Sequence, residues 1–107
     1  MKMITAIVNK EDSKAVCSAL IKGGFSVTRL STTGGFLVAG NMTLLIGTED
    51  SRVDACIEII ASCCKQRTEV VPSTSSYGLG VATAVPLQVT VGGATVFVTN
   101  VERFEKL

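Results

Sequence analysis

The sequence contains no histidine and no tryptophan, and it has only one tyrosine and two prolines. Without histidine the chain lacks the usual general base near neutral pH and the commonest side-chain ligand of metal ions. No pair of acidic residues and no nucleophile beside a base stands out in its place. The sequence therefore predicts a protein that is not an enzyme and has no metal site.

Charge is also scarce, because 10 basic residues oppose 9 acidic ones and charged residues make up only 18% of the chain. A net charge of +1 provides no general attraction to nucleic acid or to an anionic membrane, so neither is expected as a partner. No apolar run is long enough to span a membrane, and Met1 to Val8 leads into acidic residues rather than into a cleavage site. The sequence predicts neither a membrane anchor nor a signal peptide.

The four cysteines, Cys17, Cys56, Cys63 and Cys64, show no C-x-x-C spacing. A zinc ribbon or a thioredoxin-type site is therefore not indicated. The cysteines fall on mostly apolar helical segments, where a free thiol packs as a small hydrophobic group. Four reduced cysteines without a secretion signal indicate a cytoplasmic protein.

Apolar residues are abundant, at 47% of 107 residues, which predicts one globular domain over residues 1–107. Segments with the apolar pattern of strands and segments with that of helices follow one another along the chain, and an extended segment begins at Leu87. Their order is βαββαβ, so we predict an α+β fold on the ferredoxin-like plan, with two helices on one face of an antiparallel sheet. We expect another subunit to cover the second face. The expected elements are strand Lys2–Val8, helix Asn9–Lys22 ended by Gly23-Gly24, strands Phe25–Leu30 and Phe36–Gly47, and a helix from Thr48 that fades at Lys65–Arg67.

Two predictions concern the last third of the chain. Residues 68–86 are rich in serine, glycine and proline and are predicted to form a long, mobile loop. The segment Leu87–Thr99 is predicted to form a C-terminal hairpin that turns at Val91–Ala94, with Val89 opposite Val96. A Gly-Gly bulge within one long strand is the alternative.

The stretch Thr32–Asn41 combines three glycines, two adjacent hydroxyls, one aromatic ring and one amide. Its Gly-Gly pair permits a tight turn between strands. The hydroxyls and the amide could hydrogen-bond a small polar ligand, and Phe36 could stack on a ring. A plain hairpin with its aromatic side chain in the core is the simpler interpretation. No Gly-x-Gly-x-x-Gly or Walker pattern follows the stretch.

Two glycine-containing segments carry a family resemblance, namely Thr32–Leu37 with Ala39-Gly40-Asn41, and Val91–Val98. They closely resemble the PII-like cyclic di-AMP receptors of Gram-positive bacteria, and Met1–Ile4 and Arg52-Val53-Asp54 are also similar. The resemblance implies a PII-like homotrimer without catalysis, in which a nucleotide binds between neighbouring subunits and mobile loops relay the signal to an unknown protein target. Matched position by position, the residues implied to bind the ligand are Thr28, Phe36, Leu37, Asn41, Gly47 and Phe97.

The chain departs from the family pattern at four positions. Gly24, Ser26, Val38 and Lys106 stand where the family usually has asparagine, arginine, arginine and glutamine. Because a serine cannot replace the guanidinium donors of an arginine, we expect cyclic di-AMP to bind more weakly than to relatives that keep them. Two alternatives stay open: a PII-like trimer that binds ATP, ADP or another adenine nucleotide, and a non-sensing interaction module that has lost its ligand.

Overall fold

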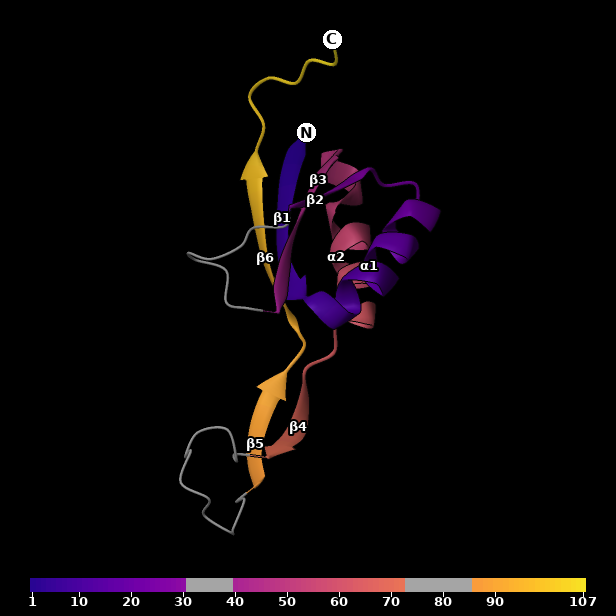
Figure 1. The fold of residues 1–107 in the computed structure, drawn as a ribbon. Helices are drawn as coiled ribbons and strands as arrows, with labels where there is room; N and C mark the ends of the chain where they lie inside the picture. The colour runs from indigo at the N-terminus through magenta and orange to yellow at the C-terminus, as the bar shows by residue number, and fades with distance from the viewer. Residues whose placement is uncertain (31–39, 73–85) are drawn as a thin grey trace.

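The protein is described by a computed structural model that covers residues 1–30, 40–72 and 86–107, with side chains for 1–30, 40–68 and 92–107. Four strands form an antiparallel sheet in the order β2-β3-β1-β6, and two helices cover one of its faces (Figure 1). This arrangement confirms the predicted ferredoxin-like α+β fold, because β1-α1-β2-β3-α2-β6 is a βαββαβ unit. The elements are β1 (Lys2–Asn9), α1 (Lys10–Lys22), β2 (Val27–Leu30), β3 (Asn41–Thr48), a 3-10 turn (Asp50–Arg52), α2 (Val53–Cys63) and β6 (Ala94–Asn100).

The core lies between the sheet and the two helices. Alternate residues of β1 and β3 point into it, as a strand with one covered face requires. The helices contribute residues at helical spacing, and the predicted burial of Cys17, Cys56 and Cys64 is confirmed, while Cys63 is half-buried. All four thiols are free. The fully buried side chains of largest volume are Ile4, Val8, Val16, Leu20, Leu44, Ile46, Cys56 and Ile60.

Helix α1 begins and ends at the predicted signals. The Asn9 side chain accepts a hydrogen bond from the Glu11 backbone N–H at 2.8 Å, which satisfies one unpaired donor of the first turn. At the other end Gly24 has φ 86°, and the Phe25 N–H donates to the Leu20 carbonyl at 2.9 Å. This bond keeps Phe25 with the helix end, so β2 begins at Val27, two residues later than predicted.

The last third of the chain pairs differently from the prediction. Arg67–Pro72, predicted as part of a loop, is strand β4 and pairs antiparallel with β5 (Pro86–Val91). The rest of the predicted loop, 73–85, lies outside the described residues. Strand β6 pairs with β1 rather than with β5, with Phe97 opposite Thr5. The predicted hairpin of Leu87–Thr99 is therefore wrong: the hairpin is β4–β5, and it lies before the last strand of the main sheet.

Two consecutive glycines account for this difference. Gly92 and Gly93 have φ 83° and 75°, and they pass the chain from the small sheet into the main one instead of reversing it. A Cβ on Gly92 would lie 2.5 Å from the Lys65 carbonyl oxygen, so only glycine fits there. The alternative of a Gly-Gly bulge within one long strand is not found either, because β5 and β6 belong to different sheets.

The molecule is elongated, with extents of 59 × 26 × 19 Å. Its radius of gyration is 17.5 Å, against about 13 Å for a compact domain of this length. The β4–β5 hairpin projects beyond one end of the main sheet, and the C-terminal tail projects beyond the other (Figure 1). Neither described helix is long and apolar enough to cross a membrane.

Candidate functional site

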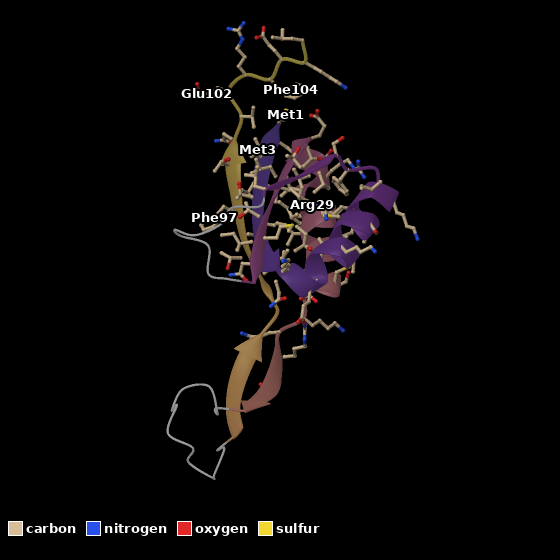
Figure 2. The ribbon with its side chains drawn as sticks, in the orientation of Figure 1. Met1, Met3, Arg29, Phe97, Glu102 and Phe104 are labelled. Atoms are coloured by element: carbon tan, nitrogen blue, oxygen red, sulfur yellow. The ribbon has the colours of Figure 1, made fainter. Side chains whose placement is uncertain are left out.

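The face of the sheet opposite the helices has no covering element among the described residues (Figure 1). One row of side chains crosses all four strands on this open face. Thr28 of β2 pairs with Leu45 of β3. Leu45 in turn pairs with Thr5 of β1, and Thr5 with Phe97 of β6. Phe97 is 54% exposed and lies on the side of β6 away from the helices (Figure 2).

Four of the six predicted ligand residues lie on this open face, namely Thr28, Asn41, Gly47 and Phe97. Phe36 and Leu37 lie outside the described residues. Thr28 and Phe97 stand on opposite edge strands, three strand spacings or about 14 Å apart. Asn41 and Gly47 stand at the two ends of β3, about 20 Å apart. The structure thus places the four residues on one surface, but too widely spread for one small pocket within a single protomer.

Gly47 is unusual because no described residue of its own protomer requires a glycine there. It is not among the glycines with positive φ, and a Cβ added to it would meet no atom of the described residues within 4 Å. A glycine inside a strand costs about 0.5–1 kcal/mol relative to alanine. No described residue fills the space above the Gly47 backbone, and close approach of another group is a usual reason for a strand glycine.

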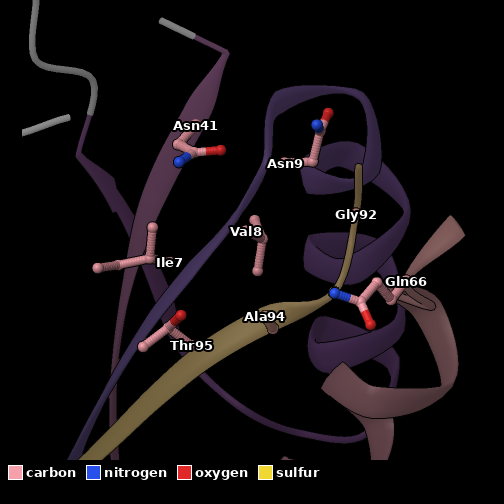
Figure 3. Close-up of a pocket in the computed structure, with 9 residues that line it drawn as sticks. Ile7, Val8, Asn9, Asn41, Gln66, Gly92, Ala94 and Thr95 are labelled. Carbon is pink, nitrogen blue, oxygen red and sulfur yellow. The ribbon is translucent and has the colours of Figure 1, made fainter. Parts of the chain in front are cut away.

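A cavity of about 340 Å³ opens where β1 ends and where β3 and β6 begin. Figure 3 shows carboxamides around it, from Asn9, Asn41 and Gln66, with Thr95 at its edge. Asn41 was predicted as a ligand residue. Asn9 was interpreted only as a helix cap, a role that it does have, and no sequence pattern marks Gln66, which lies between α2 and β4.

A carboxamide offers both a hydrogen-bond acceptor and donors, and this pair is complementary to the N6/N7 edge of adenine. The described residues that line the cavity include no charged side chain. The cavity is therefore better suited to a neutral heterocycle than to a free phosphate.

Arg67, at the start of β4, follows the lining residue Gln66 in the chain. Its guanidinium contacts the Asp12 carboxylate at 3.3 Å and the Glu11 carboxylate at 3.4 Å. These ion pairs join β4 to the first turn of α1, where acidic groups also favour the helix dipole. These contacts give Arg67 a structural role between β4 and α1.

Among solved structures, this one is similar to the crystal structure of a functionally unknown protein from Pediococcus pentosaceus ATCC 25745. The two sequences are 38% identical, and the TM-score is 0.74. The match covers 99% of this chain and 96% of that chain, so it includes the segment in which the pairing prediction failed.

A family model described as cyclic-di-AMP receptor matches residues 1–107. That family consists of nucleotide-binding receptors rather than enzymes, which confirms that the protein is not an enzyme and supports a small nucleotide as its ligand. The match extends over both segments that suggested the resemblance and over the open face described above. The chain belongs to the cyclic-di-AMP receptor family.

Proposed function

We propose that this protein binds cyclic di-AMP on the open face of its sheet, in clefts between the subunits of a homotrimer, and transmits the binding event to a protein partner. The observation that carries the proposal is Gly47, whose missing Cβ leaves space that no described residue fills, on the same face as Thr28 and Phe97. Most of the long loop predicted for residues 68–86, which we expect to relay the signal, lies outside the described residues.

The opposite positions of Thr28 and Phe97 favour a site shared by two subunits. In a ring of head-to-tail contacts, the β6 edge of one subunit approaches the β2 edge of the next. Phe97 of one copy and Thr28 of its neighbour then line the same cleft. The ring also covers the edges of β2 and β6, which have no partner strand among the described residues and are otherwise exposed to aggregation. A two-stranded hairpin such as β4–β5 is only marginally stable alone, so we expect it to pack on a neighbouring copy.

The chemistry of the described residues suits a dinucleotide of low charge. Phe97 offers a flat apolar face for stacking on a base, and the carboxamides of Asn9, Asn41 and Gln66 offer the hydrogen bonds that adenine requires. Among the described residues paired across the open face, none is charged. Because ATP carries more phosphate charge than a cyclic dinucleotide and needs more cations, this face favours cyclic di-AMP over the alternative of ATP or ADP.

Calorimetric titration with cyclic di-AMP, cyclic di-GMP and ATP tests this proposal. We expect saturable binding of cyclic di-AMP, and we expect Phe97→Ala to weaken it by about 5- to 150-fold, since stacking on one base is worth about 1–3 kcal/mol. Glu58→Ala is the control, because Glu58 is also exposed but lies on α2, away from the open face. Unchanged affinity in Phe97→Ala would contradict the site, and a monomer in sedimentation at micromolar concentration would contradict the assembly.

A further inference from the structure

A second hollow, of about 420 Å³, lies on the helix side of the sheet next to the edge strand β2. Successive turns of α1 form one wall, and β2 forms the other. Arg29 pairs with Leu44, a core position, so its side chain is on the opposite face from Thr28 (Figure 2). The lining residues are Lys14, Cys17, Ser18, Ile21, Val27 and Arg29.

Lys14 and Arg29 bring two positive charges to this hollow from separate elements. Among the described side chains, no acidic group pairs with either of them. Arg67, in contrast, pairs with Asp12 and Glu11. A concave surface lined by charge of one sign, with apolar walls behind it, concentrates the electrostatic field and attracts ions of the opposite sign.

The base of the hollow is apolar. Cys17 is only 8% exposed, and Val27 packs against the core. Burial raises the pKa of the Cys17 thiol, and the positive charge of Arg29, which lines the same hollow, opposes that shift. Ser18 adds a hydroxyl at the rim, and Ile21, at 63% exposure, adds uncovered apolar surface.

We propose that this hollow is a second ligand site, which takes a small organic anion. A carboxylate or phosphate group lies between Lys14 and Arg29, and a short apolar portion packs on Cys17, Ile21 and Val27. The volume is in the range of small-molecule sites. The hollow and the open face lie on opposite sides of the sheet. An anion in the hollow therefore does not occupy the space of a nucleotide on the open face. This inference does not depend on the identity of the nucleotide.

Amide NMR titrations of the full chain with inorganic phosphate, acetate and butyrate test this site. We expect saturable shifts in the amides of Lys14–Ile21 and Val27–Arg29 with at least one of the three anions, and tighter binding of butyrate than of acetate. Phosphate and carboxylate titrations together distinguish which anionic group the site prefers.

Charge-removing variants provide the decisive comparison. Arg29→Gln and Lys14→Gln should each lower the affinity for the anion by about tenfold, because each removes a charged hydrogen-bond donor. Lys22→Gln removes the same charge from the same helix but outside the hollow, and it should leave affinity unchanged. Non-saturating shifts with all three anions, or equal loss in Lys22→Gln, would overturn the proposal. Equal affinity for acetate and butyrate would overturn its apolar part.

Discussion

Replacing Gly47 with alanine separates what the fold requires from what the ligand requires. The backbone at Gly47 does not have positive φ, and the new Cβ would meet no atom of residues 1–30, 40–72 or 86–107 within 4 Å. The substitution also restricts the unfolded chain. We therefore expect Gly47→Ala to stabilise the isolated protomer by about 0.5–1 kcal/mol, which corresponds to a rise in Tm of about 2–8 °C for a small domain.

The same substitution should weaken nucleotide binding. If the ligand contacts the Gly47 backbone, the added methyl group occupies its place, and overpacking by one methyl typically costs about 1–3 kcal/mol. We expect a loss of affinity of about 5- to 150-fold for cyclic di-AMP in calorimetry, alongside unchanged or higher Tm in the absence of ligand. Glu58→Ala, an exposed position on α2, is the control and should alter neither property by much.

Two results would refute this reasoning about Gly47. Higher stability with unchanged affinity would mean that no ligand approaches this backbone. Lower stability, together with dissociation of the assembly in sedimentation, would mean that the open space is filled by a neighbouring subunit and not by a nucleotide.

Three further predictions concern the backbone at Gly92, the thiol of Cys64, and the effect of Gly24 and Ser26 on ligand binding. Gly92→Ala should lower the free energy of unfolding by about 1–3 kcal/mol or more, measured by urea unfolding. The reason is that φ is 83° and the new Cβ would lie 2.5 Å from the Lys65 carbonyl oxygen. A smaller loss of stability would contradict this close approach. Burial raises the pKa of the Cys64 thiol to about 11, so the folded state keeps a proton that the unfolded state loses above its ordinary value of 9.0. Stability should therefore fall between about pH 9 and 11, and Cys64→Ala should make that fall shallower. Gly24→Asn with Ser26→Arg should tighten cyclic di-AMP binding, since asparagine tolerates the left-handed φ of 86° better than most residues; unchanged affinity would show that these positions do not reach the ligand.

Local signals in the sequence determined the main elements and the core of this protein. Asn9 starts α1 and Gly23 ends it, because a side-chain cap and a glycine stop act within a few residues. Period-two and helical patterns identified β1, β3 and both helices, and the prediction that cysteines pack as small hydrophobic groups holds for Cys17, Cys56 and Cys64. The order of these elements was then enough for the ferredoxin-like plan, and two glycine-containing motifs were enough for the family.

Strand partners could not be determined from the sequence alone. Alternation along Leu87–Thr99 shows which side chains share a face, but it is equally compatible with pairing to β4, to β1 or within a hairpin. The choice of partner strand depends on Gly92, which lies close to the carbonyl of Lys65, a residue 27 positions earlier in the chain. It also depends on the edge of β1 that β3 leaves unpaired, because β6 pairs there.

The two candidate binding surfaces likewise arise only in the tertiary structure. The carboxamides of Asn9, Asn41 and Gln66 come from three separate segments and meet because β1 pairs with β3 and the chain after α2 returns to the same end of the sheet. Lys14 and Arg29 meet because α1 packs beside β2. Local sequence specifies which face of its element each side chain occupies, whereas non-local packing decides which faces come together. Binding sites depend on this non-local packing.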